Sequence, residues 1–152
     1  MSAEKVRGFL LEHGVEYSTD EHRLTYTTSE TAEAGHVPGK DMAKVVMLVA
    51  DARLVMAVVP GNERVDLDKA QAVLGASEVR LAEEAEFSPS FPDCEVGAEP
   101  PFGPIYDVPM VVDHGFDGPS ITFDAGTHTD TMTMSLEDYL RVTSPKRGDL
   151  TV

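Results

Sequence analysis

Lys44 is the residue whose setting in this sequence first suggests chemistry. It is the one charged side chain in the run Ala43-Lys44-Val45-Val46-Met47-Leu48-Val49-Ala50, and an ammonium group is costly to bury without a partner. One interpretation is a lysine at a strand end that extends its charge into water. The other is a cation directed into a cleft, where it stabilises negative charge on a substrate.

A second candidate is the stretch Gly97-Ala98-Glu99-Pro100-Pro101-Phe102-Gly103-Pro104. Small residues let a ligand approach the backbone, and the flanking prolines hold the neighbouring amides in fixed directions. The alternative interpretation is a rigid crossover that binds nothing. The stretch alone does not favour one interpretation over the other.

A third candidate is Asp124-Ala125-Gly126-Thr127-His128-Thr129-Asp130, where a glycine turn is followed by hydroxyls and an imidazole that could line a polar pocket. His128 and Asp130 would share one face if a strand has already begun, and Asp113-His114 is another pair of metal-ligating types. These spacings match no specific metal-ligand pattern, so we predict no metal site.

The sequence gives little support to a covalent nucleophile. Cys94, the single cysteine, lies between Asp93 and Glu95, and acidic neighbours disfavour the reactive thiolate. The chain contains no Gly-x-Ser-x-Gly elbow, no phosphate-binding Walker loop and no dinucleotide-binding glycine pattern. We therefore expect any reaction to proceed by attack of water in a preorganised pocket.

The elements that must position these residues can be predicted from hydrophobic periodicity and capping signals. Strands dominate and short helices flank them, which predicts an α+β fold with a mixed or mostly antiparallel, barrel-like central sheet. One domain is expected over residues 1–152, with its core at about 27–142. We expect helices at 2–12, 28–35, 66–74 and 136–142, strands at 15–19, 43–50, 53–59, 79–81, 110–113, 120–123 and 129–134, and a proline-rich loop at 87–109.

Composition limits the classes of partner. The chain has 152 residues, with 12 Lys+Arg against 27 Asp+Glu and a formal charge of −15, which argues against a DNA coat or a binder of anionic membranes. Residues 81–140 hold 13 acids and no lysine or arginine, whereas the other residues hold 14 acids and 12 bases. The single cysteine and the absence of a signal-peptide pattern predict a cytoplasmic protein.

Three stretches in order resemble the YbaK family of aminoacyl-tRNA deacylases, which are related to the editing domain of bacterial prolyl-tRNA synthetases. They are His36-Val37-Pro38-Gly39-Lys40-Asp41-Met42-Ala43-Lys44 before the apolar hairpin, Cys94 to Gly103 leading into Val108-Pro109-Met110-Val111-Val112-Asp113, and Phe123 to Asp130 before the helix that starts at Ser135. The resemblance runs from about Thr27 to Val142. It departs in one place, because Val45-Val46 follow the lysine where many relatives have Thr-Leu or Thr-Val.

The resemblance implies hydrolysis of the ester between a wrong amino acid and a tRNA 3′ end, without a metal or organic cofactor. A synthetase pocket separates small side chains by only about 1–3 kcal/mol, so a second hydrolytic site is needed. Lys44, Gly97 and Ala98 then correspond to catalytic positions, with the lysine beside the terminal adenosine and the loop backbone positioning the water. The implied substrate-binding positions are Thr27, Pro101, Phe102, Gly103, Gly126, Thr127 and His128.

The sequence therefore leaves three functions open. The leading one is a free-standing editing hydrolase for tRNA charged with alanine, cysteine or a similar small amino acid, with a tRNA of the proline type as the expected carrier. The second is a non-catalytic module that binds tRNA or a synthetase, and the third is a binder of small aminoacyl or nucleotide-like ligands. The expected partners are an aminoacyl-tRNA 3′ end and an aminoacyl-tRNA synthetase, with no DNA and no membrane.

Overall fold

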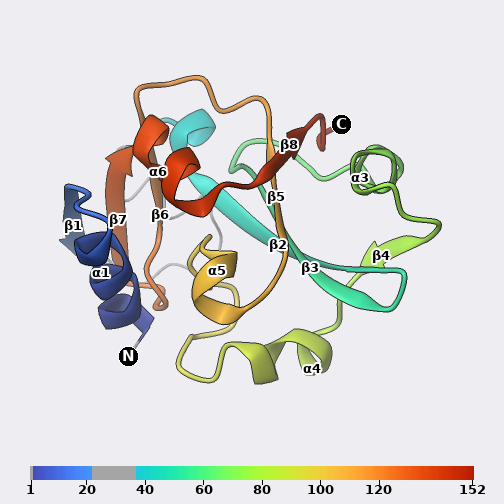
Figure 1. Ribbon diagram of the computed structural model, residues 1–152, viewed down its shortest axis with the longest axis horizontal. Coiled ribbons are helices and arrows are strands. Elements are labelled where there is room, and N and C mark those ends of the chain that lie inside the picture. Colours follow the sequence, from blue (N-terminus) through green and yellow to red (C-terminus); the bar gives the residue numbers. More distant parts are fainter. Residues whose placement is uncertain (1, 22–36) are drawn as a thin grey trace.

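The computed structural model describes residues 2–21 and 37–152, and it contains short helices around two β-sheets (Figure 1). The predicted helix at 28–35 and the candidate Thr27 lie outside the described residues. The helices are α1 (Ser2–Glu12), η1 (Gly39–Asp41), α3 (Leu67–Leu74), α4 (Glu84–Phe87), η2 (Ser88–Ser90), α5 (Gly103–Tyr106) and α6 (Leu136–Thr143). The strands are β1 (Tyr17–Glu21), β2 (Ala43–Ala50), β3 (Arg53–Pro60), β4 (Val79–Leu81), β5 (Met110–Asp113), β6 (Ser120–Asp124), β7 (Asp130–Ser135) and β8 (Lys146–Gly148).

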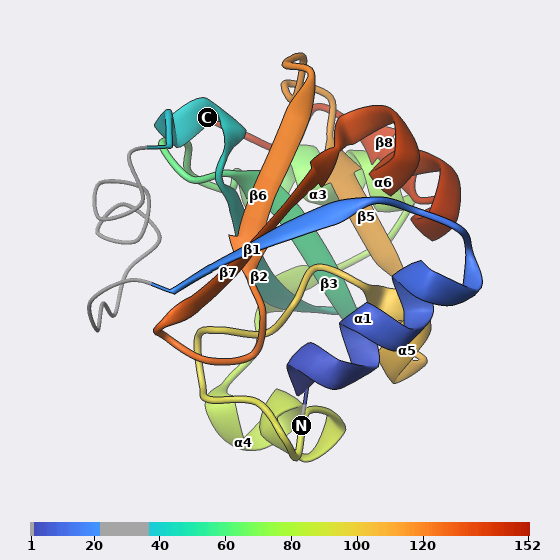
Figure 2. The ribbon, with the colours of Figure 1, turned by 90° about the vertical axis from the view of Figure 1, so that its left-hand side faces the viewer.

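The predicted α+β class is confirmed, and the strands divide into two sheets. One sheet is antiparallel with the order β1-β7-β6, and the other is mixed with the order β4-β2-β3-β5-β8. An isolated parallel bridge between Met42 and Thr122 joins them, so β6 of the first sheet runs beside the start of β2 of the second (Figure 2). The β2–β3 hairpin pairs Ala43 with Pro60 through to Ala50 with Arg53, as its apolar pattern predicted.

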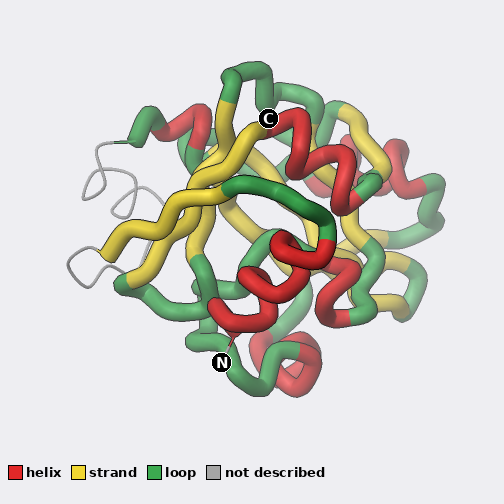
Figure 3. Tube along the Cα trace, turned by 60° about the vertical axis from the view of Figure 1, so that its left-hand side comes forward, coloured by secondary structure: helices red, strands yellow, loops and turns green. Residues whose placement is uncertain are grey.

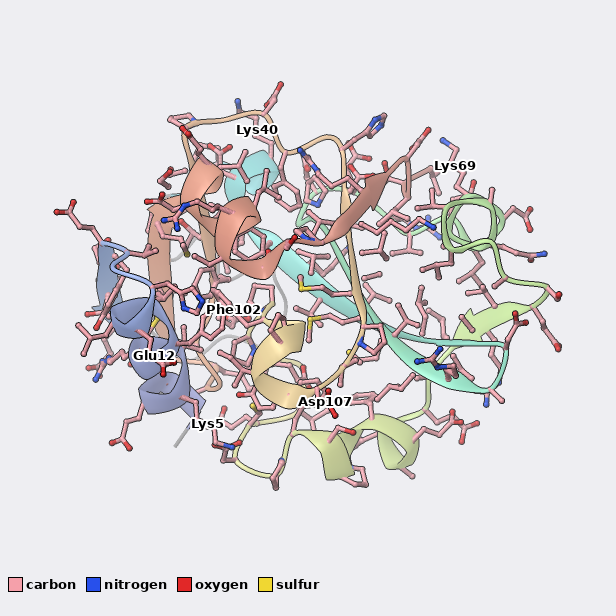
Figure 4. The ribbon with its side chains drawn as sticks, viewed as in Figure 1. Lys5, Glu12, Lys40, Lys69, Phe102 and Asp107 are labelled. Atoms are coloured by element: carbon pink, nitrogen blue, oxygen red, sulfur yellow. The ribbon has the colours of Figure 1, made fainter. Side chains whose placement is uncertain are left out.

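The main core lies between the two sheets and the helices α1, α5 and α6. Helix α1 lies beside α5 (Figure 3), and α6 packs on β6 and β7. Phe102 is fully buried at the centre of this core (Figure 4), where its ring makes edge contacts with the rings of Phe9, Phe123 and Tyr139. Aromatic pairs of this kind add to the free energy gained from burial.

The opposite face of the strands has an apolar part and a polar part. Side chains alternate along a strand, and Ile121 and Phe123 of β6 point into the main core, which puts Thr122 and Asp124 on the other face. The apolar part of this outer face belongs to the five-stranded sheet, where Leu48, Val59 and their neighbours are covered by α3 and by Leu150. The polar part belongs to β6 and β7, where the hydroxyls of Thr122 and Thr133 form a hydrogen bond of 2.7 Å.

The prediction that residues 87–109 form only loop is wrong in part. This segment contains the single turns η2 and α5, and Phe87 ends α4. Prolines occupy the first positions of both η2 and α5, where the missing N–H would have no helical partner anyway. Strand β8 is a further element that the sequence patterns did not predict, and it pairs in parallel with β5.

Tyr139 of α6 provides a test of how this segment is anchored. Its fully buried hydroxyl donates a hydrogen bond of 2.7 Å to the carbonyl oxygen of Pro101. Replacement by phenylalanine leaves that carbonyl without its partner, and we expect Tyr139→Phe to lower the free energy of unfolding by about 1–3 kcal/mol in urea denaturation. Tyr106→Phe is the matched control, because the Tyr106 hydroxyl is half-buried and faces the weak partner Cys94 at 3.4 Å. Equal losses in the two variants would contradict this role for Tyr139.

Candidate functional site

Backbone hydrogen bonds tie the proline-rich loop to the turn between β6 and β7. The N–H of Glu95 donates to the carbonyl of Gly126 over 2.8 Å, and the N–H of Gly126 donates to the carbonyl of Ala98 over 2.9 Å. The φ angles of Gly97 and Gly126 are +88° and +98°, a region that side-chain-bearing residues rarely adopt. The two glycine stretches that the sequence singled out therefore form one structural unit.

His128, in the turn, makes two further contacts with the loop. Its N–H donates to a carboxylate oxygen of Glu95 over 2.9 Å, and its ring Nε2 lies 2.8 Å from the carbonyl oxygen of Val96. The imidazole is buried, and a β-carbon added at Gly97 would lie 3.4 Å from its Cε1 atom. The His128 side of the turn and the Glu95–Gly97 part of the loop are therefore neighbours in the fold.

The distal part of the loop is anchored in the main core. Pro101, Phe102 and Gly103 are buried, and a β-carbon at Gly103 would lie 2.3 Å from the carbonyl oxygen of Val108. Pro101 is held through its carbonyl by Tyr139. These residues fix where the loop leaves the core, while Gly97 and Ala98 lie at the end that meets the turn.

The turn itself is ordered by short polar contacts. The Thr127 hydroxyl donates to a carboxylate oxygen of Asp130 over 2.6 Å, and it accepts the N–H of Asp130 over 3.1 Å. Strand β7 begins only at Asp130, so His128 and Asp130 do not occupy alternate positions of one strand. The two side chains have different hydrogen-bond partners, and they do not share the face that a strand at this point would have given them.

Two buried carboxyl groups lie at this junction, and the sequence patterns did not single them out. Asp124 ends β6, is 8% exposed, and its Oδ1 atom has no hydrogen-bond partner among the described residues. Burial raises the pKa of Asp124 to about 7, and the nearby Glu99 and Glu95 contribute to the rise while His128 opposes it. Burial likewise raises the pKa of Glu99, a residue that also accepts the N–H of Gly97 over 3.2 Å.

Lys44 lies on β2 next to this junction in register. Met42 and Thr122 are bridge partners, so Lys44 and Asp124 each follow the bridge by two residues on parallel strands and occupy the same outer face. The Lys44 ammonium donates to the backbone carbonyl of Glu63. Burial and the charge of Arg64 lower the pKa of Lys44, and Glu63 opposes this shift. No hydrogen bond or ion pair connects the Lys44 and Asp124 side chains in the described part of the chain.

The structure thus brings Gly97, Ala98, Gly126, Thr127 and His128 together and places Lys44 on the adjoining strand. The residues missed by sequence analysis are Glu95, Glu99 and Asp124. Glu99 and Asp124 lie inside the two candidate stretches and Glu95 lies beside Cys94, but the sequence does not say which of the many acids of residues 81–140 meet in space.

Cys94 and the group Asp113, His114 and Asp149 make contacts of their own. The Cys94 sulfur lies 3.4 Å from the Tyr106 hydroxyl. Asp113, His114 and Asp149 offer ligand atoms within 4.8 Å of one another. However, the two Asp113 oxygens accept the N–H groups of Gly115 and Leu150, each over 2.8 Å. These bonds explain Asp113 as a residue that ties β5 to the C-terminal segment.

Comparison with known proteins identifies the family. Residues 22–142 match the model of the aminoacyl-tRNA editing domain, and the chain belongs to this family, as its resemblance predicted. It is 32% identical to a proline–tRNA ligase of Acidithiobacillus ferrooxidans over 88 residues, which are 58% of this chain and 15% of the ligase. It is 33% identical to the proline–tRNA ligase of Bacillus mycoides over 79 residues, 52% of this chain and 14% of that ligase. The chain therefore spans only about a seventh of these relatives.

Solved structures show the same fold. A proposed trans-editing enzyme for prolyl-tRNA synthetase superposes with a TM-score of 0.83 at 24% identity, covering 99% of this chain and 97% of the other. A hypothetical protein, APE2540, superposes with a TM-score of 0.86 at 21% identity, covering 97% and 99% of the two chains. Among the described residues, the helices are all too short or too polar to cross a membrane.

Gly97 offers a test of the loop conformation. Alanine at a φ of +88° is strained, so we expect Gly97→Ala to lower the free energy of unfolding by about 1–3 kcal/mol. Gly8→Ala is the matched control, because Gly8 lies in α1 with open space around its β-carbon position, and alanine favours a helix by about 1 kcal/mol. Chemical denaturation of both variants checks the opposite signs, and a stabilised Gly97→Ala variant would contradict the assignment.

Asp124 predicts a pH-dependent stability. Its pKa rises from an ordinary 3.8 to about 7 on folding, so between these values the native state retains a proton that the unfolded chain releases, and wild-type stability falls as pH rises. Asparagine does not ionise, so the stability of Asp124→Asn relative to wild type should increase from pH 4 to pH 7 and level off above that. Urea denaturation across this range measures the difference. Asp117→Asn, the same change at an exposed position, is the matched control, and a flat curve for Asp124→Asn would refute the raised pKa.

Proposed function

We propose that this protein is an aminoacyl-tRNA deacylase that acts in trans and removes alanine, cysteine or a similar small amino acid from a tRNA of the proline type. The observation that carries the proposal is the junction between the Gly97–Ala98 loop and the Gly126–His128 turn, with Lys44 on the adjoining strand. Membership of the aminoacyl-tRNA editing domain family supports it. So does the sequence match to proline–tRNA ligases.

In the proposed reaction a water molecule attacks the carbonyl carbon of the ester. The bond from carbon to the water oxygen forms and the bond to the ribose oxygen breaks. The attacking water loses a proton and the ribose oxygen gains one, which leaves a free 3′ end and an amino acid. The loop backbone at Gly97 and Ala98 holds the aminoacyl end and positions the water. His128 and Gly126 form the wall that limits the size of the amino-acid side chain. The neighbouring 2′-hydroxyl of the substrate assists.

Lys44 supplies positive charge at the reacting end of the substrate. Its neighbour Arg64 is a second cation close enough to affect its pKa. Placed beside the terminal adenosine, the pair faces the phosphates and the negative charge that develops on the carbonyl oxygen. A fixed charge of this kind stabilises the transition state more than the ground state, which is the condition for rate enhancement.

A deacylation panel tests the activity. The protein is incubated with tRNA for proline charged with alanine, cysteine, serine or proline, and loss of the labelled ester is measured over time. We expect faster loss of the small non-cognate amino acids than of proline. Binding of these tRNAs without ester loss would instead establish the non-catalytic module. Binding of a short aminoacyl-adenosine mimic as tightly as whole tRNA would establish the small-ligand binder.

Lys44→Met tests the electrostatic role, because methionine keeps the unbranched side chain out to its ε atom and removes the charge. We expect kcat/KM for the preferred ester to fall by about 10²–10³-fold, the loss typical of removing one group that stabilises an oxyanion. Arg53→Met is the charge-matched control, since Arg53 is exposed at the other end of the same hairpin. Cys94→Ala should retain wild-type activity, and an inactive Cys94→Ala protein would point to a covalent mechanism. Full activity of Lys44→Met would exclude the proposed role.

A further inference from the structure

Asp124 is a buried acid at the end of β6. It is 8% exposed and its Oδ1 atom has no hydrogen-bond partner among the described residues. The alternation along β6 directs it away from the main core, to the outer face that also carries Thr122. Gly126, two residues further along the chain, donates its N–H to the carbonyl of Ala98. An unpaired carboxylate in such a place is costly unless a proton or a positive group reaches it.

The described part of the chain offers little positive charge here. Residues 81–140 contain no lysine or arginine, and Glu95 and Glu99 are near enough to oppose ionisation of Asp124. His128, the basic side chain nearby, directs its Nε2 to the carbonyl of Val96, and the Lys44 ammonium is bound to the carbonyl of Glu63. The junction therefore has an excess of acid that a ligand with a positive group would complement.

The proposed substrate carries one such group. A tRNA is an anion throughout, and its nucleotides would be repelled by three neighbouring carboxyls. The exception is the α-ammonium group of the esterified amino acid, which is attached to the carbon next to the reacting carbonyl. We propose that Asp124 binds this α-ammonium group and so selects esters whose amino group is free. This inference rests on the proposed function, and it names the group of the substrate that the acid recognises.

This contact makes Asp124 a specificity-determining residue that also positions the substrate. A carboxylate that holds the ammonium group fixes the adjacent carbonyl relative to the Gly97–Ala98 backbone. A substrate with a hydroxyl or an acylated nitrogen in place of the ammonium lacks the charge and gains little from the contact. The protein should therefore discriminate against N-acylated and peptidyl esters on charge as well as on size. Hydrogen bonds between charged groups contribute about 1.5–3 kcal/mol, which corresponds to about 10- to 100-fold in rate or affinity.

The turnover experiment compares alanyl-tRNA with lactyl-tRNA, in which a hydroxyl replaces the amino group, each corrected for its uncatalysed hydrolysis. For the wild type we expect corrected kcat/KM to favour the alanyl ester by about 10- to 100-fold. For Asp124→Asn we expect the two esters to be hydrolysed with similar corrected kcat/KM. Asp117→Asn removes an equal charge from an exposed position of the same acidic segment and should keep the wild-type ratio.

A binding experiment separates this inference from the hydrolase proposal. It uses adenosine carrying a stable 3′-amide to alanine or to lactate, titrated by calorimetry into the wild type and Asp124→Asn. If the wild type prefers the alanine amide and Asp124→Asn does not, the ammonium site is supported. This holds even if no charged tRNA is hydrolysed, because a lack of hydrolysis overturns only the hydrolase proposal. If the wild-type protein binds the two amides equally, the ammonium site is overturned, and no variant is needed to show this. Turnover with equal ratios in wild type and Asp124→Asn also overturns it and leaves the hydrolase standing.

Discussion

The site depends on the pairing of the proline-rich loop with the turn between β6 and β7. A long loop has many conformations, and ordering each residue costs about 1–2 kcal/mol of conformational entropy. Here the hydrogen bonds from Glu95 to Gly126 and from Gly126 to Ala98 fix one end, and the Tyr139 hydroxyl fixes Pro101 at the other. Within the loop, the N–H of Gly97 donates to the Glu99 carboxylate and the N–H of Ala98 donates to the carbonyl of Glu95, and prolines restrict the backbone that follows. Every functional role proposed for the loop follows from this pairing.

The two parts of the outer face explain where such a site could form. On the five-stranded sheet the outer face is apolar and is covered by α3 and Leu150, so it contributes to stability. On β6 and β7 the same face carries Thr122, Thr133 and Asp124, which are buried or partly buried polar groups. Lys44 lies on β2, where the apolar part and the polar part of the outer face meet. Its partner on the neighbouring strand β3, Val59, belongs to the apolar part. The partly buried position of Lys44 follows from this border and accounts for its lowered pKa.

Prediction from the sequence succeeded where a local pattern determines the structure. The hairpin at 43–60 has two nearly continuous apolar runs, and helix α3 has apolar residues at helical spacing. The helix was predicted over 66–74 and is found at Leu67–Leu74, with Asp66 and Gly75 as its caps. Strand β8 has no such pattern, since Lys146-Arg147-Gly148 becomes a strand only by pairing with β5. For the candidate site, glycines and the histidine were visible as motifs. Asp124 and Glu99 stand in the same stretches but received no role. They meet only through the pairing of segments that are distant along the chain, and a buried acid cannot be told from an exposed one by its sequence.

The uneven distribution of charge favours one orientation of the proposed substrate in the site. Arg64 is close enough to Lys44 to help lower the pKa of that lysine, whereas Glu99 and Glu95 are close enough to Asp124 to help raise the pKa of that acid. An aminoacyl-tRNA end has the complementary polarity, with phosphates on one side of the ester and an ammonium group on the other. Charges of opposite sign attract and like charges repel over several ångströms in a partly buried site. The reversed orientation would bring phosphate to carboxylate and ammonium to ammonium, so the same acids that weaken general binding of nucleic acid would align the ester for attack.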